Sequence, residues 1–318
     1  MAHPSLETLV QRIKDDAIGG AADMARESAA ALRDLARDTV GPDATALAKE
    51  IEVAIDRILD VSPSIAPVSR VLHLAGRALE EGRALDPRQL RDRVVEAMLG
   101  FVRWLDDALA RIERIGGELI EDGETIFTYS ISSTVFRMIE AARRQGKKVS
   151  VITTESRPDN EGLTTLPHMQ SMGVPVIVGV DAAVAYLLRR ATVVYVGADT
   201  VLSTGASLCK VGSLPTALAA RHHGVPFRVT ADTSKFDAAT LWGHPLVIRP
   251  TLASKILPAA PPPGVTVCSP VFEVVPPELI ACLVTEEGIF HPGSISALFR
   301  DIPQSELVAA KLAARRPS

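Results

Sequence analysis

VVYVGADTVLSTGASLCKVGS, residues 193–213, is the stretch of sequence from which the fold is best predicted. Its first four residues are apolar and mostly β-branched, which indicates a buried strand. Asp199 follows directly after this strand, and Lys210 comes shortly before a helical pattern that begins near Ser213. Ligands of open α/β sheets bind in the crevice outside the carboxyl ends of the strands. An acid, a lysine and small residues at such a place favour a polar, phosphorylated ligand.

The same alternation of apolar strands and helical segments extends over residues 118–318. We predict strands at 125–129, 148–153, 176–180, 193–196, 226–230 and 281–284, with helices at 135–145, 162–172, 181–188 and 216–223. Successive βαβ units predict an α/β domain with a Rossmann-like, mostly parallel sheet and helices on both faces. No glycine-rich dinucleotide fingerprint and no GxxxxGKS or GxxxxGKT loop occurs, so no cofactor is predicted. The proline-rich run at 258–263 is interpreted as a surface linker inside this domain.

Residues 1–117 predict an N-terminal helical domain. Alanine, leucine, arginine and glutamate dominate, and apolar residues recur at three- and four-residue spacing, as at Leu47, Ile51 and Ile55. Glycine and proline breaks divide the segment into four or five helices, the last over about 88–115. These helices are expected to form a bundle.

Composition narrows the class of protein. The chain of 318 residues is long enough for two domains, and its net charge of −4 argues against a direct nucleic-acid binder. No apolar run approaches the length of a membrane span, and the N-terminus lacks the pattern of a signal peptide. The three cysteines show neither disulfide-framework nor CxxC spacing, so no metal site is predicted. A cytoplasmic, reduced protein is expected.

Two glycine- or hydroxyl-rich turns are candidate anion sites. The first predicted strand runs into Ser130, Ser132 and Ser133 at the start of a helix, where hydroxyls and free amides bind anions. The alternative is plain N-capping by Ser132 or Ser133. Gly19-Gly20 interrupts the helical pattern near the start of the chain. It is either a helix–helix turn or a place where the backbone approaches a phosphate closely.

Charged residues follow other predicted strands. Arg157 comes after the second strand and would hold a phosphate bidentately, or would form a surface salt bridge with Asp159. Asp181, at the end of the third strand, is interpreted as the N-cap of the next helix. Lys235 follows the fifth strand and is a candidate second cationic contact. Because the carboxyl ends of parallel strands meet at one edge of a sheet, these residues are expected near Asp199.

Several long motifs carry a family resemblance. They are TESRPDNEG at Thr154, GVPVIVGVDAAVAYLL at Gly173, VGADTVLSTGASLCKVGS at Val196, GVPFRVTADTSKF at Gly224 and FEVVPPELIACLVTEEG at Phe272. Over about residues 125–298 their order and spacing resemble the translation initiation factor two-B alpha/beta/delta family. That family also contains archaeal ribose-1,5-bisphosphate isomerase and methylthioribose-1-phosphate isomerase.

The resemblance implies roles for individual residues. The isomerases of the family use an aspartate of the GAD motif, here Asp199, and a cysteine after the first strand to move protons in an aldose–ketose conversion. Basic residues hold phosphate, and the matching positions are Lys210, Arg157 and Lys235. The regulatory alpha subunits often carry glutamate in place of Asp199, so the aspartate favours chemistry.

Three positions depart from the family pattern. The cysteine position is Ser130, and an unactivated serine is a poor acid–base group near neutral pH, which costs much of a roughly 10²–10⁴-fold contribution. Cys209 replaces the asparagine before Lys210. Its thiol either has taken over the catalytic role, with the lysine lowering its pKa, or fills an apolar gap. Gly19 stands where the isomerases place an arginine, which weakens a second phosphate site.

Two functions of different classes therefore remain open. One is a ribose-1,5-bisphosphate-type aldose–ketose isomerase, with Asp199 as base. The other is a non-catalytic regulatory or initiation-factor-like subunit that binds a sugar phosphate or nucleotide as a sensor. In both cases the expected partners are a small phosphorylated sugar or nucleotide and further copies of the chain. The resemblance implies a dimer built through the C-terminal domain, or a dimer-based hexamer.

Overall fold

The computed structural model describes residues 3–15, 18–39, 43–62, 64–243, 246–248 and 250–315. The chain divides into two compact units. One comprises Met1–Asp107 together with Arg300–Ser318, and the other comprises Ala108–Phe299. Within the described residues, no helix combines the length and the apolar character that crossing a membrane requires.

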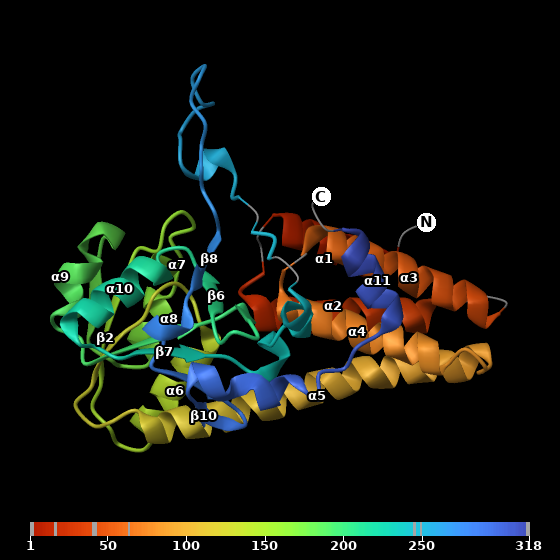
Figure 1. Cartoon of the computed structure of the whole chain (residues 1–318), viewed down its shortest axis with the longest axis horizontal. Coiled ribbons are helices and arrows are strands. Elements are labelled where there is room, and N and C mark those ends of the chain that lie inside the picture. The colour runs from red at the N-terminus through yellow and green to blue at the C-terminus, as the bar shows by residue number, and fades with distance from the viewer. Residues whose placement is uncertain are drawn as a thin grey trace. The chain divides into compact units, whose positions relative to one another are not determined.

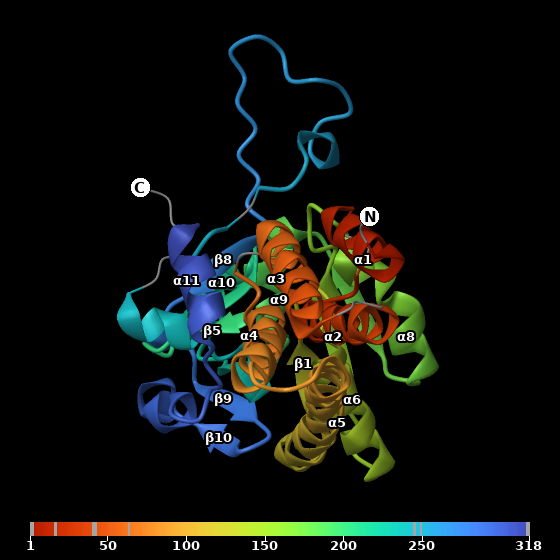
Figure 2. The same ribbon diagram turned by 90° about the vertical axis from the view of Figure 1, so that its right-hand side faces the viewer.

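The first unit is a helical bundle. Its helices are α1 (Pro4–Lys14), α2 (Ala21–Asp38), α3 (Ala44–Val61), α4 (Ala66–Glu81), the first part of α5 (Pro87–Leu119) and α11 (Glu306–Ala314). Figure 1 shows α1 to α4 running alongside one another, and Figure 2 views them nearly end-on. The three- and four-residue spacing forms one apolar face on α3, where Ile51, Ile55 and Ile58 are fully buried. The predicted bundle therefore follows from amphipathic helices that cover one another's apolar faces.

The C-terminal helix returns to this first unit. Ser305 caps α11 by accepting from Val308 N, and its own backbone N–H donates to His73 Nδ1 at 3.0 Å. Lys311 and Arg315 form ion pairs with Asp56 of α3. The division predicted from the sequence assigned these last residues to the sheet domain, and its boundary at 117 lies inside α5. The return depends on contacts between residues far apart in the sequence, and no local pattern encodes them.

The second unit is built on a seven-stranded sheet. Its strands are β1 (Thr125–Phe127), β2 (Ser150–Thr154), β3 (Val176–Gly179), β4 (Val193–Gly197), β7 (Phe227–Thr230), β9 (Cys282–Thr285) and β10 (Gly288–Phe290). Their order is β10-β9-β7-β4-β1-β2-β3, and only β10 runs antiparallel to its neighbour among these described strands. All six predicted strands are present, and the predicted fold class is confirmed. The structure adds β10 at the edge.

Helices connect the parallel strands. They are α6 (Ser133–Arg144), α7 (Glu161–Thr164), α8 (Leu166–Ser171), α9 (Val184–Leu188) and α10 (Ser213–His223). The single helix predicted over 162–172 is in fact two short helices, since Pro167 sits in the first turn of α8. Short 3₁₀ turns complete the unit: η1 (Asp181–Ala183), η2 (Thr233–Lys235), η3 (Ala238–Trp242), η4 (Ala253–Lys255), η5 (Pro277–Leu279) and η6 (Pro292–Phe299). A core of fully buried side chains, including Ile126, Met138, Val193 and Tyr195, joins the sheet to α6 and the end of α5.

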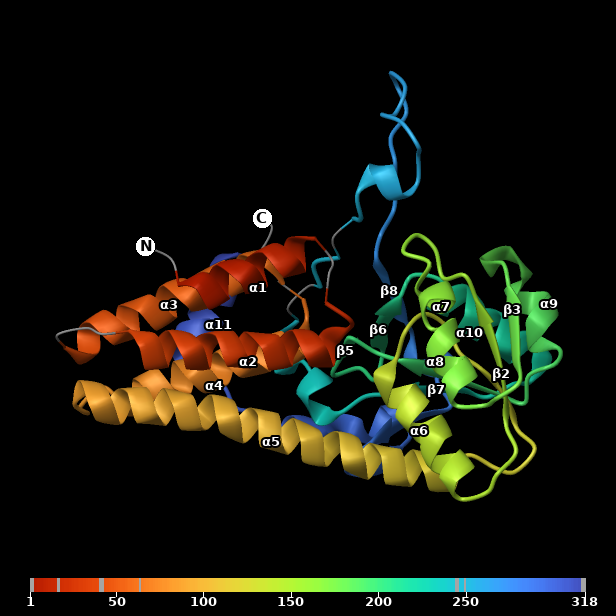
Figure 3. The same ribbon diagram turned by 180° about the vertical axis from the view of Figure 1, so that it is seen from behind.

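A second, antiparallel sheet lies at the end of the first. It contains β5 (Thr200–Val201), β6 (Ser207–Lys210) and β8 (Phe272–Val275), in the order β5-β6-β8. None of these three strands was predicted. Between η3 and β8, Pro250 and Pro270 pair and close the base of an arm formed by residues 250–270. The arm contains η4 and the exposed proline run at 258–263, as the predicted linker requires (Figure 3).

The strand order marks where a ligand of this fold would bind. From β1 the chain moves outward through β2 and β3, and then crosses to β4 on the other side of β1 and continues to β7 and β9. The direction of winding therefore reverses between β1 and β4. Ligands of doubly wound sheets bind at such a switch point, outside the carboxyl ends of the strands. Ser130 follows β1 and Asp199 follows β4.

Candidate functional site

Ser130 stands at the carboxyl end of β1 in an uncommon backbone conformation. Its φ of 65° lies in the left-handed region, which costs energy for a residue with a side chain. The conformation is held because Ser130 N donates to Ser156 Oγ at 2.9 Å. The Ser130 hydroxyl donates to the Glu161 carboxylate. The serine is therefore a buried hydroxyl fixed against a carboxylate.

Glu161 belongs to a network of alternating charges. Lys210 Nζ, at the end of β6, donates to Glu161 Oε1 at 3.1 Å and to Asp159 Oδ2 at 2.5 Å. Lys255 Nζ, from the arm, donates to Asp159 Oδ1 at 2.5 Å. Burial alone would lower the pKa of Lys210, but the two carboxylates outweigh it and raise that pKa. The ammonium of Lys210 thus stays charged between two acids.

Asp199 lies next to this network. Its backbone N–H donates to Leu208 O at 2.9 Å, which ties the end of β4 to β6. Burial raises the pKa of Asp199 to about 6, with the charge of Glu161 acting in the same direction and Lys235 and Lys210 acting against it. A carboxyl group that titrates near 6 is suited to take and return a proton at neutral pH.

Lys235 completes the group. It lies in η2 with 6% of its surface exposed, and its ammonium makes no hydrogen bond or ion pair with any residue in the described part of the chain. Its charge acts on Asp199 and on Cys209, so all three share one site. A buried lysine whose ammonium has no bonded protein partner is a candidate site for an anionic ligand group.

Cys209 is a buried thiol between these charges. It is fully buried on β6, where it and Lys210 point to opposite faces of the small sheet. Burial and the neighbouring Asp199 both raise the pKa of the thiol. The thiol therefore stays protonated at neutral pH, and its surroundings match those of a small side chain that fills an apolar gap.

Other predicted residues take different places. Arg157 is exposed and its guanidinium donates to Lys255 O at 2.8 Å. The predicted salt bridge between Arg157 and Asp159 is absent among the described residues, because Asp159 is taken up by the two lysines. The prediction that Asp181 is an N-cap is wrong, since its carboxylate accepts from the backbone N–H groups of Ser156 and Arg157.

The remaining candidates lie at helix starts. Ser132 accepts from Val135 N at 3.3 Å and is the N-cap of α6, as the capping alternative predicts. Ser133 is exposed in the first turn of the same helix. Gly19 and Gly20 belong to the helical unit, where Gly20 precedes α2 with a φ of 106° that favours glycine. A role of Ser133, Gly19 and Gly20 in phosphate binding stays a prediction.

Sequence reasoning missed Asp159, Glu161 and Lys255 as members of the site. Asp159 and Glu161 are two residues apart in TESRPDNEG, after the second strand, and that position was the available signal. The sequence around Lys255 contains no signal that it belongs to the site, because Lys255 reaches Asp159 only through the folding of the arm. In the part of the chain that the structure describes, no group of three or more histidine, cysteine or acidic side chains is arranged to hold a metal ion.

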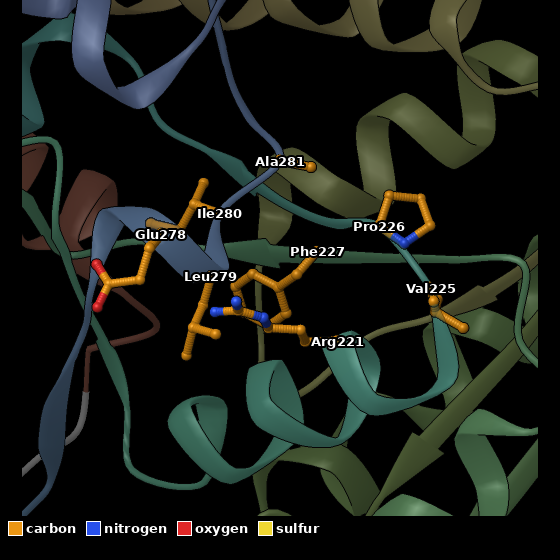
Figure 4. Close-up of a pocket in the computed structure, with 9 residues that line it drawn as sticks. Arg221, Val225, Pro226, Phe227, Glu278, Leu279, Ile280 and Ala281 are labelled. Atoms are coloured by element: carbon orange, nitrogen blue, oxygen red, sulfur yellow. The ribbon is translucent and has the colours of Figure 1, made fainter.

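A separate cavity of about 370 Å³ lies at the other end of the sheet (Figure 4). Arg221 from α10, Phe227, and Glu278 and Leu279 from η5 line it. Its lining residues directly precede β7 and β9, so it opens at the amino ends of these strands. Because ligands of this fold bind at the carboxyl ends, the cluster around Asp199 remains the candidate site.

Comparison with known proteins agrees with the motifs. Residues 17–292 match the Initiation factor 2 subunit family. The ribose 1,5-bisphosphate isomerase of Archaeoglobus fulgidus is 33% identical over 287 residues, which cover 89% of this chain and 88% of that protein. The solved structure of the translation initiation factor eIF-2B of Pyrococcus horikoshii OT3 superposes with a TM-score of 0.76 at 29% identity, covering 94% of this chain and 99% of that one. The 5-methylthioribose 1-phosphate isomerase of the same organism shares the fold, with a TM-score of 0.74 at 19% identity over 98% of this chain and 88% of that one.

Proposed function

The chain belongs to the Initiation factor 2 subunit family, and we propose that it is an aldose–ketose isomerase of a phosphorylated sugar. The observation that carries the proposal is the surroundings of Asp199. This carboxyl group follows β4 at the switch point of the sheet, its pKa is raised to about 6, and Lys210, Lys235 and Glu161 act on it. The relatives named ribose 1,5-bisphosphate isomerase support the same class of reaction.

The reaction needs a base for carbon and a charge that stabilises the intermediate. In an aldose–ketose conversion, one proton leaves the carbon next to the anomeric carbon, and a proton is returned to the anomeric carbon. Asp199 takes and returns this proton, because a carboxylate with a pKa near 6 is ionised at pH 7 yet basic enough to accept it. Lys235, whose ammonium has no bonded partner among the described residues, stabilises the negative charge that develops on the substrate oxygens.

The reaction also moves a proton between two substrate oxygens. The resemblance implies that a cysteine shares the proton transfers of the reaction with the aspartate, and this chain has Ser130 at the cysteine position. A serine hydroxyl alone holds its proton too tightly for the task. Because the Ser130 hydroxyl donates to Glu161, the carboxylate can accept a proton that the serine takes from one oxygen, and can return it through the serine to the other. We assign the oxygen-to-oxygen transfer to this pair.

The test is an assay of the purified chain. Ribose 1,5-bisphosphate, 5-methylthioribose 1-phosphate and ribose 5-phosphate are each supplied, and the ketose product is measured. We expect turnover of at least one of them, and we expect Asp199→Asn to reduce it by about 10²-fold or more. Asp107→Asn, which makes the same change at an exposed position of α5, is the matched control and should leave turnover unaltered.

A second function is favoured by one observation, the serine at the cysteine position. In that case the chain is a non-catalytic sensor that binds a sugar phosphate or nucleotide in the same site. Thermal stabilisation by these ligands, without turnover of any of them, would establish the sensor and exclude the isomerase. The homodimer or dimer-based hexamer implied by the resemblance is part of both proposals, and light scattering of the purified chain tests it.

A further inference from the structure

Two serines near the switch point share an uncommon backbone conformation. Ser130 follows β1 with a φ of 65°, and Ser156 follows β2 with a φ of 58°. Both values lie in the left-handed region, which is unfavourable for a residue with a side chain and persists only where surrounding contacts hold it. The two residues are bonded to each other, since Ser130 N donates to Ser156 Oγ at 2.9 Å. The conformation of Ser130 therefore depends on where Ser156 lies.

Ser156 is in turn held by Asp181, the first residue of η1. Asp181 Oδ1 accepts from Ser156 N at 2.9 Å, and Oδ2 accepts from Arg157 N at 2.7 Å. The hydroxyl of the fully buried Ser156 also donates to Thr154 O at 3.4 Å. Its proton is therefore directed at Thr154, which leaves a lone pair for the Ser130 N–H. One carboxylate thus fixes the turn on which Ser130 depends.

A third bond reaches Asp181 from the residue before Ser130. Tyr129 is buried, and its hydroxyl is hydrogen-bonded to the Asp181 carboxylate. Burial, followed by the charge of Asp181, raises the pKa of this tyrosine, so the hydroxyl keeps its proton and donates. The tyrosine packs against Gly212, where an added Cβ would lie 2.1 Å from the tyrosine oxygen. Asp181 therefore holds both the residue before Ser130 and the partner of the Ser130 N–H.

The backbone of Ser130 controls the direction of its hydroxyl. The angle φ is the rotation about the bond between N and Cα, so it relates the direction of the N–H to that of Cβ. With the N–H on Ser156 and φ held at 65°, the Ser130 hydroxyl reaches the Glu161 carboxylate. A relaxation of φ to the usual negative values, with the N–H in place, would turn Cβ away from Glu161.

We propose that Asp181 is a positioning residue of the proposed isomerase: by binding the Ser156 N–H, it holds Ser130 in the left-handed conformation and the Ser130 hydroxyl against Glu161. The inference rests on the proposed function, in which Ser130 and Glu161 move a proton between two substrate oxygens. It adds the residue that keeps this pair together, which acts through Ser156 and not on the substrate.

The position requires a carboxylate. Two backbone N–H groups, those of Ser156 and Arg157, each occupy one oxygen of Asp181. The amide of asparagine offers a single acceptor oxygen and would turn its NH₂ group towards one of these donors. Among the described residues, the charges that act on the pKa of Asp199 do not include that of Asp181. Removal of the Asp181 charge should therefore disturb the Ser130 conformation and leave the strength of the base unaltered.

Steady-state kinetics of the full chain test the proposal, with ribose 1,5-bisphosphate, 5-methylthioribose 1-phosphate and ribose 5-phosphate as substrates. Asp181→Asn should lower kcat by about tenfold or more and leave KM within about twofold, because proton transfer is slowed while the substrate is bound as before. The pH at which kcat/KM falls, which Asp199 sets, should not move. Asp122→Asn is the matched control: its carboxylate also accepts a backbone N–H, that of Lys148 at 2.6 Å, outside the site, and turnover should not change.

A double-mutant cycle separates positioning from a general loss of structure. If Asp181 acts through Ser130, Asp181→Asn should lower kcat no further in a chain that already carries Ser130→Ala. Ser156→Ala removes the acceptor of the Ser130 N–H, so it should lower kcat by about the same factor as Asp181→Asn, and the two together by no more. An equal loss in the wild-type and Ser130→Ala backgrounds would overturn the inference, as would an unchanged kcat for Asp181→Asn.

Hydrogen exchange followed by mass spectrometry is a second measurement and requires no activity. Exchange in peptides that contain Ser130 should become about tenfold faster or more in Asp181→Asn and in Ser156→Ala, but not in Asp122→Asn. If Asp181→Asn does not fold, Ser156→Ala decides by the same two measurements. If the wild type converts none of the sugar phosphates, the proposed function is overturned, and unchanged exchange would overturn the hold of Asp181 on Ser130 as well. If the wild type is active and neither kcat nor exchange responds, the inference is overturned and the isomerase proposal stands.

Discussion

Replacing Asp199 with asparagine should stabilise the folded chain at neutral pH. Burial raises the pKa of this carboxyl from its ordinary value near 3.8 to about 6, so the folded state binds the proton more tightly than the unfolded state does. Between pH 4 and pH 6 the folded chain therefore holds more protons than the unfolded chain, and stability falls as the pH rises through that range. The difference in pKa corresponds to about 3 kcal/mol at pH 7. Asparagine carries no charge to bury and avoids this cost.

The assay is urea denaturation of the wild type, Asp199→Asn and the control Asp107→Asn at pH 7, 5.5 and 4. We expect Asp199→Asn to gain about 1–3 kcal/mol in free energy of unfolding at pH 7 and to lose that advantage towards pH 4, where the wild-type carboxyl is protonated when folded. The exposed Asp107 should show no such trend. A gain that is absent at pH 7, or that is the same at every pH, would refute the argument that Asp199 is held in a destabilising charged state.

Three further predictions follow from the same structure. The value of kcat/KM should fall about tenfold for each pH unit below 6, as Asp199 becomes protonated. Lys235→Gln should raise the pH at which this fall begins and Glu161→Gln should lower it, because the two charges act on the pKa of Asp199 in opposite directions. pH–rate profiles of the wild type and the two variants measure these shifts. Ser130→Cys should raise turnover by about tenfold or more by introducing the thiol that the family resemblance implies at this position, and unchanged turnover, measured in the same assay, would show that serine with Glu161 is already adequate. Burial lowers the pKa of His73 to about 4, so the free energy of unfolding should fall by up to about 3 kcal/mol as the pH drops from 6.5 to 4. His73→Asn should remove this fall in stability, as melting experiments at different pH values would measure.

The parallel sheet could be predicted because its strands are short apolar runs bounded by glycine, proline and polar residues. Val193–Gly197 is buried along nearly its whole length, and its continuous run of apolar residues predicts such a buried strand. The small antiparallel sheet could not be predicted in this way. Its central strand, β6, contains a buried lysine and a buried serine, whose environment is made by partners elsewhere in the chain. Local sequence gives no period of two that would distinguish this strand from a loop.

The same distinction applies to the site. Neighbouring positions for Asp199 and Ser130 could be predicted from the sequence, since both follow parallel strands, whose carboxyl ends meet at one edge of the sheet. The ion-pair partners of Lys210 could not be predicted, because the position of a residue relative to a strand does not indicate which acidic side chain it will contact. Lys255 lies in the arm, and its bond to Asp159 exists only in the folded chain. The pairing of charges is therefore known only from the structure.

The pairing also connects binding to the strength of the base. Of the charges that lower the pKa of Asp199, that of Lys235 acts most strongly, and Lys235 is a buried residue whose ammonium lacks a bonded partner among the described residues. A phosphate bound at Lys235 would neutralise that charge and bring a negative charge close to the carboxyl. Both effects raise the pKa of Asp199 and make it a stronger base when the substrate is in place. Lys210 cannot act in this way, because Asp159 and Glu161 already balance its charge whether or not a ligand is bound. In the proposed isomerase, Lys235 would therefore both bind the phosphate and strengthen the base.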